Sequence, residues 1–325
     1  MSRILTTPSA LAQAGLVRPE DIAVLDCVAE RYAISITPQI ASLIEHADDP
    51  IGRQFLPTAS ELRDRDDEAA DPIGDAAHSP VQGIVHRYRD RVLLKLVQAC
   101  PVYCRFCFRR AEVGPGEGAL SAAELDAALA YIRAHPEIWE LIVTGGDPFI
   151  LSARRAAALV AQVSAIGHVR ILRWHTRVPV VDPQRISDDF VRSITLAGGA
   201  TYVVLHANHP RELTQEARRA CAKIVDAGIP MLSQSVLLKG INDDIDTLEA
   251  LMRAFVEARI KPYYLHHLDR APGTSHFRVP IAQGRELIRQ LRARASGLCQ
   301  PEYVLDGPEE RAKQRLLEVG NQALS

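Results

Sequence analysis

The sequence has no excess of charge of either sign, little lysine and no long hydrophobic run. Its 38 Lys plus Arg are balanced by 40 Asp plus Glu, for a formal net charge of −2. Coating nucleic acid or an anionic membrane requires a basic excess, so both roles are excluded. No window reaches the roughly 18 apolar residues that a membrane-spanning helix needs. With 325 residues, 47% of them hydrophobic, the chain is predicted to be a soluble, cytoplasmic globular protein.

Cysteine spacing is the first informative pattern. Three of the six cysteines lie in one short run, CPVYCRFCFRR, as Cys100, Cys104 and Cys107. These spacings bring three thiols together on one loop, and pairing them as disulfides would leave one over. The other three cysteines are scattered and are predicted to be buried as small hydrophobic side chains: Cys27, Cys221 and Cys299.

The triplet predicts a metal centre. Thiolate ligands select zinc or an iron–sulfur cluster. A structural zinc site requires a fourth Cys or His at finger-like spacing, and none follows in the sequence. Three ligands without a fourth favour a cluster with one iron left open for a small molecule, and zinc is the alternative.

The rest of the chain predicts a mostly parallel sheet. Residues 1–80 read as a helical N-terminal segment with two loops rich in Pro, Asp and Gly. Further on, short apolar runs alternate with amphipathic helical stretches, which is typical of βαβ units. Six strands are predicted: 92–97, 141–144, 169–174, 201–205, 231–237 and 262–268. We expect an α/β fold, a partial (β/α)6 barrel over 81–298 followed by a C-terminal tail, 299–325; a flatter doubly wound sheet is the alternative.

Unusual polar residues cluster where these strands end. Ligands bind at the carboxyl ends of parallel strands, both in barrels and in open sheets. The cysteine loop follows the first predicted strand and the glycine pair Gly145-Gly146 the second. Later strands contain or precede several polar residues: His206, Gln234, Lys239, His266 and Asp269.

With its CxxxCxxC loop after the first predicted strand and its glycine pair after the second, the chain resembles the radical S-adenosylmethionine (SAM) superfamily. Within it, the chain is similar to the lysine 2,3-aminomutases and the related enzymes that make β-lysine for elongation factor P. The resemblance extends from about residue 32 to 306 and rests on the motifs HRYRDRVLL, CPVYCRFCFRR, VTGGDP, RVPVVDPQRI and HANHP. CxxxCxxC alone is moderately specific, whereas HRYxDRVLL before it and RVPVVxPQRI after it are nearly diagnostic.

The resemblance implies three cofactors. Cys100, Cys104 and Cys107 would bind three irons of a [4Fe-4S] cluster, and SAM would take the fourth iron, which accounts for the missing ligand. Gly145, Gly146 and Asp147 would approach the methionyl end of SAM; a plain turn that needs glycine is the alternative. Migration of an amino group calls for pyridoxal phosphate.

Pyridoxal phosphate requires a lysine, and the chain has only five. The family places this lysine in a glycine-rich loop seven residues after an aspartate. Asp306 and Lys313 have this spacing, but Glu309, Glu310, Arg311 and Ala312 replace the glycines, so a helix start with Lys313 on its solvated face is the alternative. Lys239 is the second candidate for the cofactor lysine.

Further roles also follow from the resemblance. Arg109 would bind the substrate α-carboxylate, a task suited to a planar guanidinium. Asp269 and Asp306 would hold the distal ammonium of lysine. The remaining residues matched to cofactor-binding positions are Arg87, Tyr88, Arg91, His206 and Gln234.

These assignments predict an isomerase that converts L-lysine to β-lysine. Its expected partners are L-lysine and an electron donor of the flavodoxin or ferredoxin type, with no nucleic acid and no membrane. Elongation factor P as the object of modification, a homo-oligomeric state, and a degenerate radical SAM protein without pyridoxal phosphate are left open.

Overall fold

The structure, a computed structural model, describes residues 3–114, 118–308 and 312–317. Its helices are α1 (Pro8–Gln13), α2 (Ile22–Arg31), α3 (Pro38–Ala41), α4 (Gly52–Phe55), α5 (Ala122–Ala134), α6 (Ala153–Ser164), α7 (Val178–Val181), α8 (Asp188–Ser193), α9 (Gln215–Asp226), α10 (Ile245–Glu257) and α11 (Ile281–Arg294). Its strands are β1 (Ile84–Tyr88), β2 (Arg91–Val97), β3 (Glu140–Gly145), β4 (Ile171–Thr176), β5 (Ala200–His206), β6 (Met231–Leu237), β7 (Ile260–His267), β8 (Glu302–Leu305) and β9 (Gln314–Arg315).

The strands form one open sheet whose spatial order equals their order in the sequence. Strands β2 to β8 are parallel, and β1 and β9 add antiparallel edges. No pairing joins β1 to β9 in the described part of the chain, so the barrel is partial, as predicted. All six predicted strands are present. Three were missed, and β8 raises the number of parallel strands from six to seven.

Local sequence explains where the covering helices begin. Ser121, Ser152, Thr214 and Asp244 each accept a hydrogen bond from a backbone N–H in the first turn of the helix that follows. Such side chains satisfy amide groups that have no partner inside the helix. One of the amphipathic stretches that the sequence predicts as helical, 182–199, forms only a short 3-10 turn and α8.

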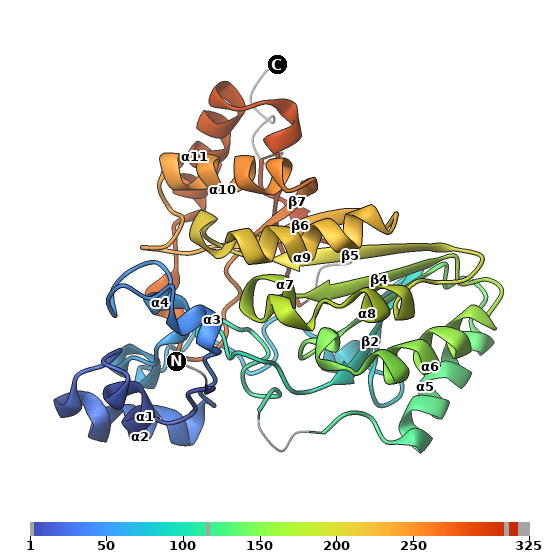
Figure 1. Cartoon of the computed structure of the whole chain (residues 1–325), viewed down its shortest axis with the longest axis horizontal. Coiled ribbons are helices and arrows are strands. Elements are labelled where there is room, and N and C mark those ends of the chain that lie inside the picture. Colours follow the sequence, from blue (N-terminus) through green and yellow to red (C-terminus); the bar gives the residue numbers. More distant parts are fainter. Residues whose placement is uncertain (1–2, 115–117, 309–311, 318–325) are drawn as a thin grey trace.

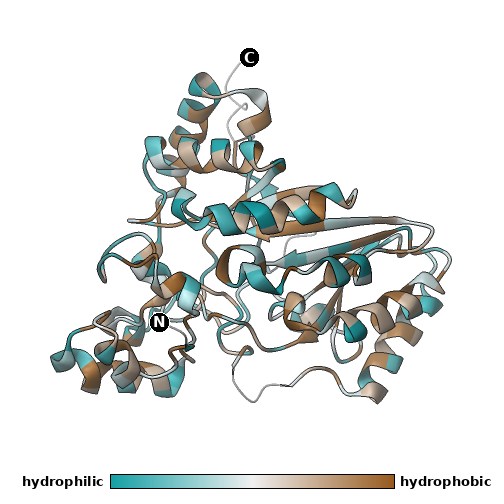
Figure 2. Ribbon diagram, in the orientation of Figure 1, coloured by the Kyte–Doolittle hydropathy of each residue, from teal (hydrophilic) through white to brown (hydrophobic). Residues whose placement is uncertain are grey.

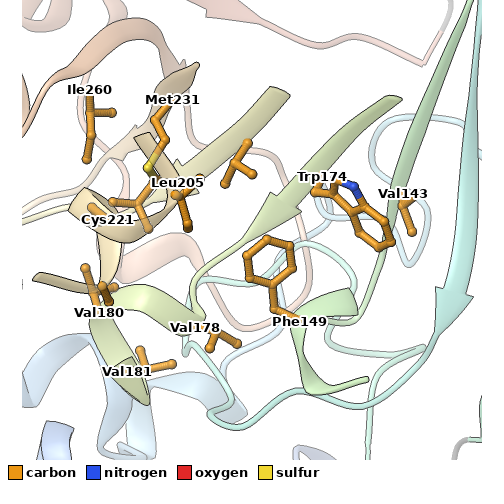
Figure 3. Packing of buried hydrophobic residues seen from close by; sticks show 14 of the residues in the cluster. Val143, Phe149, Trp174, Val178, Val180, Val181, Leu205, Cys221, Met231 and Ile260 are labelled. Atoms are coloured by element: carbon orange, nitrogen blue, oxygen red, sulfur yellow. The ribbon is translucent and has the colours of Figure 1, made fainter. Parts of the chain in front are cut away.

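The two faces of the sheet differ in chemistry. Side chains alternate along a strand. Leu172 and Trp174 of β4 belong to the main core, where Trp174 lies beside Phe149 (Figure 3). Helices such as α9 and α10, which carry both hydrophilic and hydrophobic residues (Figure 2), cover this face. Arg173 and His175 alternate with the core residues and point into the barrel instead. The barrel interior is therefore polar.

The N-terminal helices α1 to α4 form a group beside the sheet (Figure 1). Hydrogen bonds connect this group to the barrel: Thr37 Oγ1 donates to the Val181 carbonyl oxygen at 2.5 Å, and Ser35 Oγ to the Pro101 carbonyl oxygen at 2.7 Å. Among the helices that the structure describes, none is both long and apolar enough to cross a membrane. The division of the chain near residues 80 and 298 stays a prediction.

Candidate active site

The three clustered cysteines lie on the loop after β2 and line one pocket. The empty volume of this pocket, including its open mouth, is about 370 Å³, and Tyr32 and Tyr103 also line it. All three cysteines are free thiols. The pocket thus presents three sulfur atoms to whatever fills it.

The electrostatics of this pocket fit a positively charged group. Burial raises the pKa of Cys100 well above its usual value, and Asp147 and the other two cysteines raise it further. Burial and Cys104 raise the pKa of Cys107 to about 11. Three thiolates this close repel one another, and iron ions would offset the repulsion.

A single ion and a cluster make different demands on three thiols. Among the described residues, no three His, Cys, Asp or Glu side chains converge on one ion position. Each thiolate of a cluster binds a different iron, so the sulfur atoms surround a larger body than one ion. Of the scattered cysteines, Cys221 and Cys299 are buried as predicted. Cys27 is exposed, because α2 buries Leu25 and Val28 and turns Cys27 to the other side.

A buried ion-pair group supports the cysteine loop from the N-terminal segment. Glu61, in a 3-10 helix, accepts from Arg105 Nε at 3.0 Å and Nη2 at 2.5 Å, and it also pairs with Arg110. The Arg110 guanidinium stacks over the Tyr32 ring at 3.5 Å. Sequence reasoning noted these arginines but not Glu61, whose local pattern is that of an ordinary polar helix residue.

Replacing Glu61 should destabilise the fold strongly. In Glu61→Ala, both arginines stay buried without their carboxylate, and we expect the free energy of unfolding to fall by about 3–5 kcal/mol. Urea denaturation measures it. The control is Asp226→Ala, which removes an exposed pair with Arg259 and should cost less than about 1 kcal/mol. Equal losses in the two variants would contradict the supporting role of Glu61.

The glycine pair brings the end of β3 against the cysteine loop. A Cβ on Gly145 would lie 2.3 Å from the Val97 carbonyl oxygen, and one on Gly146 would lie 2.2 Å from that of Ala99. Gly145 also has a φ of +112°. Any side chain here would push the cysteine loop away, so the glycine pair has a structural task.

Asp147 joins the ends of β3 and β4. Its carboxylate accepts from Thr176 Oγ1 at 2.8 Å and from the Arg177 N–H at 2.6 Å. Burial raises the pKa of Asp147 in spite of these bonds. The carboxylate is thus directed at the protein's own backbone.

His206 and Gln234 lie on the inner face of the sheet. The His206 ring stacks on Phe106 of the cysteine loop, with centroids 5.7 Å apart. Gln234 Nε2 lies 3.4 Å from His175 Nδ1. These two predicted residues therefore extend the site from the cysteine loop into the barrel.

Lys313 and Asp306 meet where β8 and β9 join the sheet. The Lys313 ammonium forms an ion pair with the Asp306 carboxylate and lies 5.8 Å from the centre of the Tyr264 ring. Burial opposes ionisation of Asp306, but Lys313 and His266 outweigh it and lower the pKa of this carboxyl. Lys239, in contrast, is exposed. The expected change of loop type at residues 309–311 lies outside the described residues.

Asp269 is a second carboxylate beside this pair. No hydrogen bond or ion pair reaches its side chain within the described part of the chain. Burial and the nearby Asp306 raise its pKa to about 7, against the opposing charges of Lys313 and Arg109. Two carboxylates, Asp269 and Asp306, lie near one ammonium, that of Lys313. When both are ionised, this group has room for a second positive charge.

Arg109 connects the cysteine loop with these carboxylates. Its Nη2 pairs with Asp75 at 2.7 Å, and its Nε is buried without a hydrogen-bond partner among the described residues. Asp75 is a contact that sequence reasoning missed. Because Arg109 also lowers the pKa of Asp269, the cysteine loop and the segment after β7 face the same interior.

The HRYRDR motif spans the first hairpin of the sheet. Arg87 reaches the C-terminal strands: its Nη1 lies 4.0 Å from Asp306 and donates to the Gly307 carbonyl oxygen at 3.4 Å. Tyr88 and Arg91 lie at the amino end of β2, where the guanidinium stacks over the ring at 3.8 Å. Of these three residues, Arg87 is the one that lies close to Asp306, the partner of Lys313.

Comparison with known proteins defines the class first. The model of the radical SAM superfamily matches residues 94–252. A radical SAM methyltransferase from Sphaerobacter thermophilus shares the fold, with a TM-score of 0.52 and 18% identity over 68% of each chain. The chain is a radical SAM protein, and both the predicted superfamily and the predicted fold class are confirmed.

Closer relatives define the family. The L-lysine 2,3-aminomutase of Clostridium subterminale is 38% identical over 309 residues, which cover 94% of this chain and 74% of that protein. The glutamate 2,3-aminomutase of Clostridioides difficile is 36% identical over 292 residues, covering 89% and 69%. The chain belongs to the radical SAM 2,3-aminomutase family and is an isomerase that moves an amino group.

Membership implies a [4Fe-4S] cluster, SAM and pyridoxal phosphate as cofactors. The residues present fit them. Three thiols line one pocket, which suits the cluster. Inside the barrel, three buried nitrogen atoms have no hydrogen-bond partner among the described residues: Arg87 Nη2, Arg173 Nε and His175 Nε2. Such donors suit an anionic cofactor beside Lys313.

Proposed function

We propose that this enzyme converts L-lysine to β-lysine. The observation that carries the proposal is the pair of carboxylates, Asp269 and Asp306, beside Lys313. Asp269 has no partner among the described residues, and the Lys313 ammonium, which pairs with Asp306, acts electrostatically on Asp269 as well. An alkylammonium group therefore already lies where the distal ammonium of a lysine substrate would bind.

Each end of the substrate has a charged partner in this proposal. Arg109 binds the α-carboxylate with the guanidinium that Asp75 orients. Asp269 and Asp306 hold the distal ammonium. The same carboxylates repel a substrate with an acidic side chain, so L-glutamate is rejected.

The cofactor contacts are proposed from the family resemblance, together with the positions of the cysteines and Lys313. Cys100, Cys104 and Cys107 bind the cluster. Lys313 binds pyridoxal phosphate, which supplies a conjugated system that can delocalise an unpaired electron. With the cofactor bound, Lys313 would no longer be a free ammonium paired with Asp306, which would leave Asp306 available to the substrate. The remaining proposed contacts to SAM and pyridoxal phosphate are Gly145, Gly146, Asp147, Arg87, Tyr88, Arg91, His206 and Gln234.

The test is turnover of two amino acids by the reconstituted enzyme under anaerobic conditions. With dithionite, SAM and pyridoxal phosphate present, we expect β-lysine from L-lysine and no β-glutamate from L-glutamate. A flavodoxin or ferredoxin should replace dithionite as the electron donor. No product from either amino acid, with the cluster intact, would contradict the proposal, and product from glutamate alone would overturn the substrate. Substituting elongation factor P for free lysine tests the protein-bound alternative.

A further inference from the structure

Arg177, which follows β4, contacts a sulfur of the cysteine loop. Its Nη1 lies 2.8 Å from Cys104 Sγ. Its Nη2 donates to Gln54 Oε1 and to Glu212 Oε2, each at 2.6 Å. The Phe55 ring lies 4.5 Å from the guanidinium carbon. The guanidinium is buried and has a defined direction toward one sulfur atom.

Further hydrogen bonds fix the partners of Arg177 in place. The second oxygen of Glu212 accepts from the Asn208 N–H at 2.8 Å and from the His209 N–H at 3.0 Å. Gln54 Nε2 donates to the same oxygen at 3.2 Å. Arg177 cannot turn away from Cys104 without leaving the buried Glu212 carboxylate unpaired, which is costly.

We infer that Arg177 is a positioning residue that raises the reduction potential of the cluster through Cys104. The inference rests on the proposed role of Cys104 as a cluster ligand. One-electron reduction adds a negative charge to the cluster, and a donor with positive charge at a ligand sulfur stabilises the reduced form more than the oxidised form. The burial of the guanidinium strengthens this effect, because little water screens the charge.

Glu212 should act in the opposite direction. Its carboxylate lies against Arg177 and partly offsets the positive charge that the cluster experiences. Glu212→Gln keeps the shape of the side chain and removes that negative charge, so the potential should rise. Arg177→Gln removes the positive charge, so the potential should fall. Opposite signs from two neighbouring variants distinguish tuning from simple loss of structure.

The test is a potentiometric titration of the reconstituted holoenzyme, monitored by the electron paramagnetic resonance signal of the reduced cluster. At the wild-type midpoint we expect about a tenfold lower ratio of reduced to oxidised cluster in Arg177→Gln, which corresponds to a shift of about 59 mV. Arg177→Lys keeps the charge and should shift less. The control is Arg211→Gln, which loses a pair with Asp49 at 3.3 Å, away from the sulfur atoms, and should keep the wild-type potential.

The measured potentials separate failure of this inference from failure of the proposed function. Unchanged potentials, or shifts of the same sign in Arg177→Gln and Glu212→Gln, would overturn the inference. Where Arg177→Gln fails to retain iron and sulfide, the inference is tested by the sign of the potential shift in Glu212→Gln and by the size of the potential shift in Arg177→Lys. A wild-type protein that assembles no cluster would instead overturn the ligand assignment in the proposed function.

Discussion

Lys313→Ala should abolish turnover and leave the cluster intact. We expect product formation to fall by about 1,000-fold or more, because the cofactor loses the amine that binds it. Bound pyridoxal phosphate should disappear from the absorbance spectrum, while the iron and sulfide content stays at the wild-type level. The cluster and the lysine lie on different segments of the chain, so one can be lost without the other.

The matched control is Lys239→Ala, which removes the other lysine that the sequence left as a candidate. This side chain is exposed, and the variant should behave as wild type. A pyridoxal band that persists in Lys313→Ala and disappears in Lys239→Ala would reverse the assignment. Absence of the band in the wild-type protein would favour a degenerate radical SAM protein.

Asp269→Asn should weaken lysine turnover and change its pH dependence. The ammonium of the substrate needs an ionised carboxylate, and the pKa of Asp269 is raised to about 7. In the wild-type holoenzyme a cofactor-bound Lys313 no longer lowers this pKa as a free ammonium, so kcat/KM should rise with pH through about 7 or above. The variant should lose this rise and show about 100-fold lower kcat/KM at pH 8, the size expected for a charged hydrogen bond. A steady-state pH profile measures both effects.

The same substitution should stabilise the fold at high pH. The pKa of Asp269 is higher in the folded than in the unfolded chain, so the wild-type protein loses stability as the pH rises from about 4 to about 7. The carboxamide of the Asp269→Asn variant cannot ionise, so the variant should melt above the wild-type temperature at pH 8. The difference should shrink at pH 5. A lower melting temperature at pH 8 would contradict the raised pKa.

Local pattern predicted most of the sheet. Strand β6 has the predicted bounds, Met231–Leu237, because seven residues are enough to show a strand pattern. Strands β8 and β9 have four and two residues, too few for any periodicity, and were assigned to a tail. Strand β1 was also missed, because its sequence, IVHRY, is short and ends in polar residues.

The sequence predicted some residues of the site and missed others. The family resemblance assigned the cysteines, Lys313, Arg109 and the two aspartates to one site, but it predicted no contacts between them. The partners Glu61, Asp75 and Gln54 come from the N-terminal segment, in which the sequence assigned no site residue. A buried carboxylate is rare and needs a specific cation, and only the folded chain shows that Arg105 and Arg109 supply one.

The contacts that hold the cysteine loop join residues far apart in the sequence. Arg105 and Glu61 are 44 positions apart, Arg177 and Gln54 are 123 apart, and Arg110 contacts the Gly273 carbonyl oxygen 163 positions away. Closing such long loops costs chain entropy before any contact forms, so these pairs form late in folding. During synthesis the three cysteines leave the ribosome well before Arg177 and Gly273, so for that interval the cysteine loop lacks the contacts that these two residues make. We therefore expect cluster insertion to follow folding of the barrel, and the nascent thiols to be most open to oxidation in that interval.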